Sequence, residues 1–281
     1  MDLPRCLAYP GTPELKRYLG EVRAAFRITR LVLHFMGGAV LVAFAFPLLA
    51  HSRRHALRRR WSRQLLGIFN IRLVLNGVAP VRGSLLVANH ISWLDIYGIM
   101  AVQPAAFVSK AEVRSWPLVG WLAARTDTLF LRRGNRGHFR TINAEIGMRL
   151  EAGGNVTVFP EGTTTDGTHM LDFHAALLQP AVDTGHPVQP WALYYRGMDG
   201  LSNRVAAYAG DTTMWQSLRS VALQAGLSLH IDIAPALPTR GAHRRDIAAA
   251  AYEAIAERLG TTLDERGPDD PVHFPGTPTT P

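Results

Sequence analysis

The 281-residue chain has a single cysteine, Cys6. A disulfide within the chain needs two cysteines and a cysteine-based zinc site needs several, so both are excluded. Glycine and proline occur at ordinary frequency, with 25 and 18 residues, and 47% of the residues are hydrophobic. These values exclude a collagenous, low-complexity or disordered protein and are sufficient for one or two folded domains.

Several enzyme signatures are also missing from the sequence. There is no G-x-S-x-G nucleophile elbow, which disfavours an esterase of the α/β-hydrolase type. Neither a Walker phosphate-binding loop nor a dinucleotide-binding glycine fingerprint occurs. A short cluster of acidic and histidine side chains matches no defined metal spacing, and we expect no bound metal there: Asp166, His169, Asp172 and His174.

Acidic residues are absent between Glu21 and Asp95, a stretch that contains eleven arginines. Within it, residues 31–50 (LVLHFMGGAVLVAFAFPLLA) carry no formal charge and would cover about 30 Å as a helix, roughly the thickness of a bilayer's hydrocarbon core. The flanking arginines suit anionic lipid head groups. We interpret the segment as membrane-associated. A buried core helix is the alternative, and the uncharged run argues against nucleic acid as the partner of the arginines.

The apolar segment either spans the membrane or dips into it, with an amphipathic helix at 61–69 as its returning partner. The larger arginine cluster follows the apolar run, which favours a cytoplasmic position for the rest of the chain. Lysine occurs only twice among 30 basic residues, which is typical of GC-rich bacterial genomes. We therefore expect the protein at the cytoplasmic side of a bacterial inner membrane.

After about residue 70, short apolar runs alternate with helical stretches. Strands are predicted at 71–76, 84–88, 105–109, 128–131, 155–159, 188–195 and 229–233, and helices at 93–102, 136–152, 171–184 and 243–259. This alternation predicts an α/β fold with a largely parallel or mixed sheet covered by helices. We divide the chain into N-terminal membrane-associated helices with a basic collar (1–66), an α/β domain (67–262) and a tail (263–281) expected to be disordered.

Polar or ionisable residues follow four consecutive predicted strands, at the end where parallel sheets bind ligands: Asn89-His90, Lys110, Arg132-Arg133 and Pro160-Glu161-Gly162. Asp95 lies five residues after His90, in the first turn of a predicted helix. A carboxylate on one ring nitrogen would fix the tautomer of a histidine acting as a general base. The alternative is structural, because Ser92-x-x-Asp95 also matches a helix capping box.

Four short motifs, in order across about residues 80–195, resemble those of the glycerolipid acyltransferases, the family of 1-acylglycerol-3-phosphate acyltransferase. They are Asn89-His90 with Asp95 (NH-x4-D), Phe130-Leu131-Arg132-Arg133 (F-[IL]-x-R), Phe159-Pro160-Glu161-Gly162-Thr163 (FPEGT) and the later proline-containing strand with Val188-Gln189-Pro190. An N-terminal membrane helix pair also fits this family.

The resemblance implies transfer of a fatty acyl group from a thioester to the hydroxyl of a lysolipid, without an acyl-enzyme intermediate. His90 would be the general base and Asp95 would orient it. Glu161, Gly162 and Thr163 would hold the acceptor, and Arg133 its phosphate. The implied donor is acyl-CoA or acyl-carrier protein, no metal or redox cofactor is implied, and the other partners are membrane lipids. Lys110 is a weaker phosphate candidate by its strand-end position, and the arginine pair could instead be an exposed ion-pair cluster.

The sequence departs from the family pattern near the expected head-group site. Thr164 and Thr165 stand where many phosphate-using members have arginine, and Asp127 stands where glycine is common. The resemblance favours 1-acylglycerol-3-phosphate as the acceptor, with phosphatidic acid as the product. The departures make a phosphate-free lysolipid, such as lyso-ornithine lipid, the alternative. Outside the family, the candidates are a lipid hydrolase and a non-catalytic membrane-binding protein.

Overall fold

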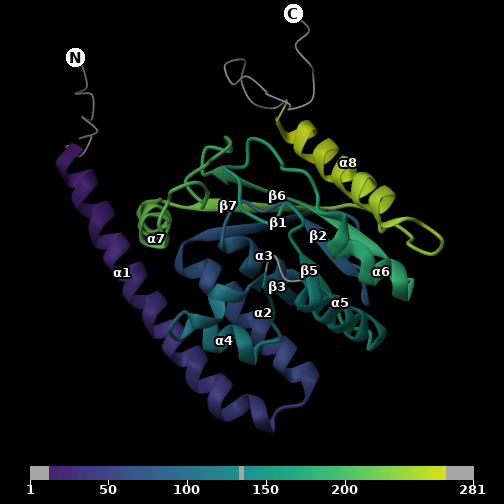
Figure 1. The fold of residues 1–281 in the computed structure, drawn as a ribbon. Helices are drawn as coiled ribbons and strands as arrows, with labels where there is room; N and C mark the ends of the chain where they lie inside the picture. The colour runs from purple at the N-terminus through teal and green to yellow at the C-terminus, as the bar shows by residue number, and fades with distance from the viewer. Residues whose placement is uncertain (1–12, 133–135, 264–281) are drawn as a thin grey trace, which may run out of the picture.

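The computed structural model of the chain describes residues 13–132 and 136–263 (Figure 1). The elements in chain order are α1 (Pro13–Val40), η1 (Leu41–Ala45), η2 (Phe46–Leu48), α2 (His51–Ile68), β1 (Ile71–Gly77), β2 (Leu85–Ala88), α3 (Leu94–Val102), β3 (Ala106–Lys110), η3 (Ala111–Ser115), α4 (Val119–Arg125), β4 (Leu129–Leu131), α5 (Arg136–Glu151), β5 (Val156–Val158), η4 (Ala175–Leu178), α6 (Gln179–Thr184), β6 (Val188–Gly197), α7 (Met214–Leu223), β7 (Leu227–Ile233) and α8 (Arg244–Leu263). The part of the tail at 264–281 lies outside the described residues.

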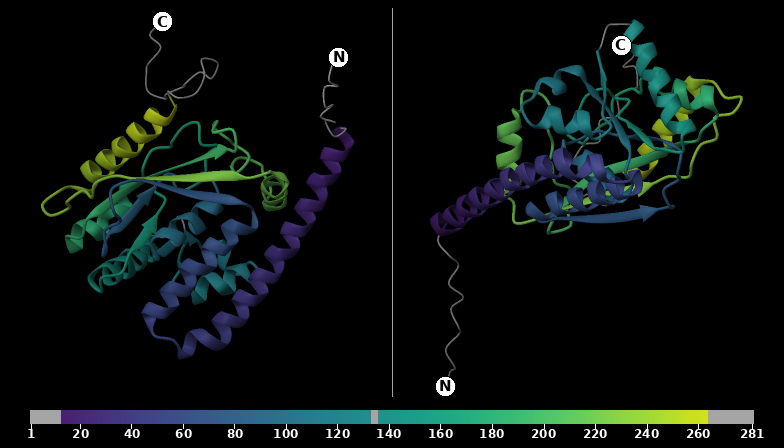
Figure 2. Two further views of the ribbon diagram at one scale, coloured as in Figure 1. Left: turned by 180° about the vertical axis from the view of Figure 1, so that it is seen from behind. Right: turned by 90° about the horizontal axis from the view of Figure 1, so that it is seen from below.

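The strands form one mixed sheet in the order β1-β7-β6-β2-β5-β3-β4. All neighbouring pairs are parallel except β6 and β7, which are antiparallel. Helices cover both faces of the sheet (Figures 1 and 2). The predicted α/β class and the mixed, helix-covered sheet are therefore confirmed.

All seven predicted strands and three of the four predicted helices are present, with shifts of a few residues at their ends. The helix predicted at 171–184 is wrong at its start, because Leu171 donates its N–H to the Glu161 carboxylate and His174 donates to the Pro160 carbonyl. Helix formation begins only at η4. The short helix α4 and the helix α7 were not predicted.

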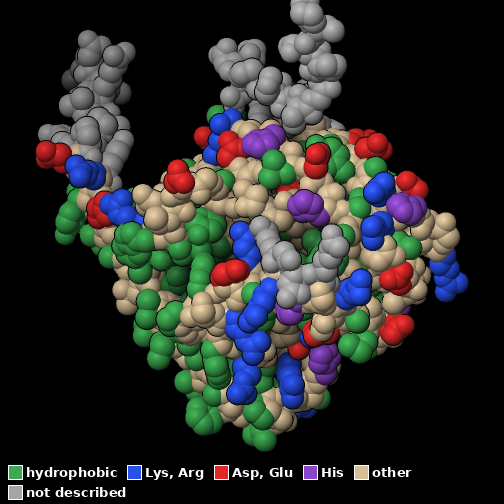
Figure 3. Space-filling view, in the orientation of Figure 1, with side chains coloured by type: hydrophobic (Ala, Val, Ile, Leu, Met, Phe, Trp, Pro, Cys, Tyr) green, Lys and Arg blue, Asp and Glu red, His purple; other side chains and the backbone are tan. Residues whose placement is uncertain are grey.

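The first helix α1 continues through a π-helical turn, η1, and a 3₁₀ turn, η2, before α2 returns toward the sheet. The segment Arg17–Leu48 is long and apolar enough to cross a membrane, and only 22% of its most apolar window is buried. A core helix would be mostly buried, so the core-helix alternative is disfavoured. Large apolar side chains are exposed along its length, among them Phe26, Leu33, Phe44 and Leu48, and hydrophobic side chains gather along this border of the molecule (Figure 3).

Several arginines of the basic collar contact the α/β domain through backbone carbonyl groups. Arg27 donates to Ala222, Gln224 and Ala225 at the C-terminal end of α7, and Arg23 donates to Leu223. From α2, Arg63 donates to Ala101 in the last turn of α3, and Arg58 donates to Ala105, just before β3. The guanidinium groups of Arg23, Arg27 and Arg63 thus meet the electronegative carbonyl ends of α7 and α3. The basic segment therefore fastens the helix pair to the domain, in addition to any contact with lipid.

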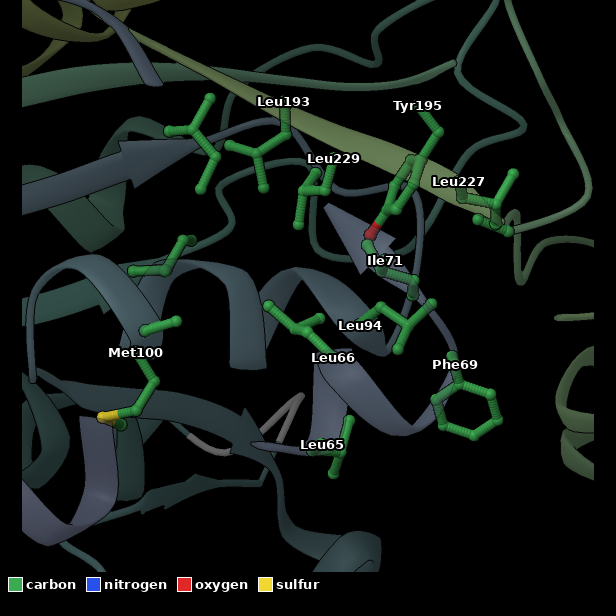
Figure 4. Packing of buried hydrophobic residues seen from close by; sticks show 14 of the residues in the cluster. Leu65, Leu66, Phe69, Ile71, Leu94, Met100, Leu193, Tyr195, Leu227 and Leu229 are labelled. Atoms are coloured by element: carbon green, nitrogen blue, oxygen red, sulfur yellow. The ribbon is translucent and has the colours of Figure 1, made fainter. Parts of the chain in front are cut away.

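The core lies in two layers, one on each face of the sheet. One packs α2 and α3 against β1, β6 and β7 (Figure 4), and the other packs α5, α6 and α8 against the opposite face. Strand β2 is fully buried, as are its neighbours β5 and most of β6. Burial on both faces leaves these strands little freedom to move, so the residues at their ends have fixed positions.

Candidate functional site

The carboxyl ends of β2, β3 and β5 lie at one edge of the sheet, because β2 and β3 both pair in parallel with β5. Asn89 and His90 follow β2, Pro160 and Glu161 follow β5, and Lys110 ends β3. The structure thus brings together at one edge the strand-end residues that the sequence analysis had singled out. Arg133 lies outside the described residues, and its predicted role in phosphate binding stays a prediction.

His90 and Asp95 form a direct hydrogen-bonded pair. The His90 Nδ1 lies 2.9 Å from Asp95 Oδ2, and Asp95 has no solvent exposure. The same carboxylate oxygen accepts the backbone N–H groups of Ile91 and Ser92, each at 2.8 Å. The assigned N-cap of α3 is Trp93, which makes no side-chain cap. Ser92 and Asp95 nevertheless make capping contacts, since the Ser92 hydroxyl accepts the Leu94 N–H at 3.3 Å and Asp95 accepts the Ser92 N–H. Asp95 therefore both caps the turn and holds the histidine.

The partner of Nδ1 determines which ring nitrogen can react. A carboxylate only accepts hydrogen bonds, so we assign the proton to Nδ1 and the lone pair to Nε2. The ring of Phe159 stacks on the imidazole, with centroids 3.8 Å apart and an angle of 11° between the planes. His90 therefore has one fixed orientation, and Nε2 is available as a base to a substrate in the cavity that His90 lines.

Glu161 is buried beside His90 and uses both carboxylate oxygens on the backbone. Oε1 accepts the His90 N–H at 2.7 Å, and Oε2 accepts the Leu171 N–H at 2.8 Å. Burial raises the pKa of Glu161 to about 7, although the two N–H groups oppose the shift; the charge of Asp95 adds to it. Glu161 thus positions the loop that carries His90, and its predicted contact with the acceptor stays a prediction.

Two further contacts hold the loop of His90 on either side. The Asn89 amide donates to the Leu193 carbonyl and accepts the Leu193 N–H, which continues the pairing of β2 with β6 beyond the last strand residue. The His90 carbonyl accepts the Thr165 N–H at 2.8 Å. The His90 backbone is therefore fixed at both its N–H and its carbonyl, as a preorganised base requires.

A cavity of about 720 Å³ is lined by His90 together with residues of the N-terminal helices. Its walls are mainly apolar and come from α1, α2, α3, η3 and α4, with Phe35, Trp61, Tyr97 and Trp116 among the lining side chains. Gly162, Thr163 and Lys110 line the same cavity. Its size and apolar character are typical of a site for a small hydrophobic ligand.

Cations are few on the described walls of this cavity. Arg58 and Lys110 are the Lys or Arg side chains that line it within residues 13–132 and 136–263. Arg58 is engaged by Asp127 at 2.8 Å and by the Ala105 carbonyl at 2.7 Å. Asp127 has a positive φ of 66°, which explains why glycine suits this position in the family pattern. Lys110 is exposed at the end of β3 and is available to an anionic ligand.

Thr164 and Thr165 contact the protein itself. The Thr164 hydroxyl donates to the Tyr208 carbonyl, and the Thr165 hydroxyl accepts the Gly167 N–H at 3.2 Å. Nearby, Asp166 accepts hydrogen bonds from Thr168 and lies 3.5 Å from His169. Across the described ranges we find no group of three or more His, Cys, Asp or Glu side chains placed to hold a metal ion.

Sequence reasoning missed two residues that contact the site from distant parts of the chain. Tyr195, on β6, donates its hydroxyl to Asp95 Oδ1 at 2.6 Å. Tyr208 lines the cavity, and its N–H donates to the Ile91 carbonyl at 2.9 Å. Tyr195 lies 100 residues after Asp95, and Tyr208 lies 117 residues after Ile91, so no local spacing signals either contact. The pairing of β2 with β6 brings Tyr195 near, and the loop that follows β6 carries Tyr208.

Comparisons with known proteins place the chain in a family. A sequence model of the family described as Acyltransferase matches residues 73–194. The chain is 40% identical over 202 residues to a lyso-ornithine lipid O-acyltransferase of Pseudomonas aeruginosa, covering 72% of this chain and 78% of that one. It is 37% identical over 159 residues to a 1-acyl-sn-glycerol-3-phosphate acyltransferase of Neisseria meningitidis, covering 55% and 62%. The crystal structure of the Thermotoga maritima 1-acyl-sn-glycerophosphate acyltransferase has the same fold, with a TM-score of 0.69 at 20% identity over 89% of this chain and 98% of that one.

Proposed function

The chain belongs to the acyltransferase family whose members acylate lysolipids, and we propose that it transfers a fatty acyl group from a thioester to the free hydroxyl of a lysolipid. The observation that carries this proposal is the His90–Asp95 pair, whose histidine lines a large apolar cavity. The cavity offers an apolar surface to acyl chains, and the pair supplies a base in its wall.

The proposed reaction is a direct transfer. His90 Nε2 takes the proton of the lysolipid hydroxyl as its oxygen attacks the thioester carbonyl. Asp95 stabilises the imidazolium that forms. The tetrahedral intermediate then loses the thiolate, which takes the proton from His90. One C–O bond forms and one C–S bond breaks, so no metal or redox cofactor is needed. Acyl-CoA and acyl-carrier protein are the two proposed donors.

Two acceptors have support from different observations. For 1-acylglycerol-3-phosphate, Lys110 is an exposed cation at the cavity, where it can bind a phosphate. For lyso-ornithine lipid, the Thr164 hydroxyl is bonded within the protein at the position where many phosphate-using members carry arginine. The relative that aligns over the larger share of this chain also carries the lyso-ornithine name.

We further propose that α1 and α2 dip into one leaflet rather than cross the membrane. Arg27 ties the middle of α1 to α7, and Arg58 and Arg63 tie α2 to the same domain. A spanning α1 would have its two ends on opposite sides of the bilayer, whereas these contacts lie on one domain. The helix pair would place the cavity at the membrane surface, on the cytoplasmic side of a bacterial inner membrane.

The test is a transfer assay with the purified full chain in detergent. Thiol release and diacyl product are measured with one acyl donor, with and without lysolipid. We expect product only when acceptor is present; free fatty acid released without acceptor would instead indicate a hydrolase. No transfer by the wild-type chain, with vesicle binding that is unchanged after His90, Asp95 and Glu161 are all replaced, would indicate a non-catalytic membrane-binding protein.

A competition assay separates the two acceptors. Lysophosphatidate and lyso-ornithine lipid are supplied in equal amounts with one donor, and both products are quantified. Lys110→Ala should lower the use of lysophosphatidate more than that of lyso-ornithine lipid. Arg140→Ala is the matched control, because Arg140 is exposed on α5 and does not line the cavity. If Lys110→Ala lowers both products by the same factor, as Arg140→Ala is expected to do, that result would contradict a head-group role for Lys110.

A further inference from the structure

Asp95 has a second partner, which the proposed mechanism does not use. Tyr195 lies on β6, 100 residues after Asp95 in the sequence, and it is only 3% exposed. In Figure 4 its side chain points from the strand into the core, with its hydroxyl oxygen next to Ile71 in this view. The hydroxyl donates to Asp95 Oδ1 at 2.6 Å, a short distance typical of a hydrogen bond to a carboxylate.

The two oxygens of Asp95 have different partners. Oδ2 accepts His90 Nδ1 and the N–H groups of Ile91 and Ser92. Oδ1 accepts the Tyr195 hydroxyl, and within residues 13–132 and 136–263 we find no other donor to it. Since Asp95 is fully buried, water cannot replace this partner without a change in packing. Tyr195 therefore fixes the rotation of the carboxylate about its own axis.

The phenol is itself held in place. The Ser92 hydroxyl makes a side-chain hydrogen bond to the Tyr195 oxygen, and Ser92 is fully buried at the start of α3. Burial, followed by the charge of Asp95, raises the pKa of Tyr195 well above its usual value, so the phenol stays a donor at any pH at which the protein works. Ser92, Tyr195, Asp95 and His90 thus form a continuous chain of hydrogen bonds that ends at the reactive imidazole.

We propose that Tyr195 is a positioning residue for acyl transfer, which holds Asp95 in the orientation that His90 requires, with Ser92 holding Tyr195. This inference rests on the proposed function. Tyr195 does not touch the substrate; it acts through Asp95. By donating to Oδ1 it also draws charge from the carboxylate, so that the proton between Asp95 and His90 stays on Nδ1.

The proposal predicts a specific signature for Tyr195→Phe, which removes one oxygen and keeps the ring. Loss of a hydrogen bond to a buried carboxylate should lower kcat about tenfold to a hundredfold, with little change in KM for either substrate. The more basic Asp95 should stabilise the imidazolium, so the acidic limb of the pH profile of kcat/KM should move to higher pH. Among the described residues, Glu161 also interacts with Asp95 through its charge, and Glu161 is unchanged in the variant.

Tyr194→Phe is the matched control. Tyr194 is the neighbouring residue on β6, its ring stacks on His230 at 4.8 Å, and it belongs to the opposite core layer. It should keep the wild-type kcat and pH profile. Ser92→Ala should change kcat and the pH profile in the same direction as Tyr195→Phe, by a smaller factor, because it leaves the bond to Asp95 in place.

The decisive experiment combines Tyr195→Phe with Asp95→Asn. If Tyr195 acts through Asp95, adding Tyr195→Phe to Asp95→Asn should cost less than about twofold in kcat, although it costs tenfold or more in the wild-type chain. Equal losses in both backgrounds, or an unshifted pH profile in Tyr195→Phe, would overturn the proposal while leaving the proposed function intact. A wild-type chain that transfers no acyl group to any lysolipid would overturn the proposed function and, with it, this role of Tyr195.

Discussion

The contact between Arg27 and the end of α7 permits a quantitative test of how the N-terminal helices attach to the domain. Arg27 is only 7% exposed as a residue, and its guanidinium group donates to three carbonyl oxygens at 3.1, 2.5 and 3.3 Å. Hydrogen bonds from a charged donor contribute roughly 1.5–3 kcal/mol each in favourable cases. Water can reach some of these carbonyls once the side chain is gone, so we expect Arg27→Ala to lower the free energy of unfolding by about 3 kcal/mol in total.

For a chain of this size, such a loss should lower Tm by about 6–12 °C. The assay is thermal unfolding of the purified protein in detergent, followed by circular dichroism. Arg30→Ala is the matched control, because Arg30 is exposed on the same helix and its guanidinium group lies over the ring of Phe26 at 5.6 Å. We expect it to change Tm by less than about 3 °C. Equal Tm values for the two variants, with a selective loss of vesicle binding in Arg27→Ala, would show that Arg27 serves lipid head groups and would refute this reasoning.

Three other predictions follow from the site and the helix pair. Asp95→Asn should lower kcat by at least about a hundredfold with little effect on the KM of the acceptor, because the imidazolium loses its counter-charge; a change confined to KM would contradict the role of Asp95. Glu161 ionises near pH 7 when folded but near 4.5 when unfolded, so wild-type stability should fall as pH rises between these values. Glu161→Gln, measured by chemical denaturation, should therefore be less destabilised relative to wild type at pH 7 than at pH 5, and a deficit that grows with pH would contradict the raised pKa. Phe44→Asp should lower the fraction of protein that sediments with anionic vesicles. Leu201→Asp, which changes an exposed loop residue far along the chain, should leave this fraction unchanged. Equal effects of the two substitutions would argue against α1–η1 as the membrane-contacting segment.

The local part of the site was predictable from the sequence because its signals are local. His90 and Asp95 are five residues apart, and Glu161 follows a short buried strand, so strand ends and motif spacing were enough to single them out. Tyr195 was not predictable, since its approach to Asp95 depends on the pairing of β6 with β2 and on which face of β6 it occupies. A contact across 100 residues leaves no trace in local spacing.

The partners of the arginines were likewise hidden from sequence analysis. Composition predicted a basic collar around an apolar helix, but Arg27 and Arg58 bond to backbone carbonyls of the domain. Charge patterns show how many cations a segment has and not whether a helix end lies opposite them. The helix α7 was missed even though Thr213 and Gln216 form a capping box at its start, a signal that the sequence did contain.

The antiparallel pairing of β6 with β7 also could not be predicted from local pattern. The residues of β7 alternate between buried and half-buried positions along Leu227–Ile233, as a strand with one better-covered face does. This alternation indicates a strand but not the direction of its neighbour, since a long connection that contains α7 lies between β6 and β7.

The central claim is that His90 deprotonates the lysolipid hydroxyl, and its most direct test is the rate of lysolipid-dependent thiol release by His90→Ala. The variant is compared with wild type at saturating donor and acceptor, after circular dichroism has established that both have the same Tm within about 3 °C. We predict that the variant still binds the acceptor but turns over at least about a hundredfold more slowly. Turnover close to the wild-type rate would contradict the account.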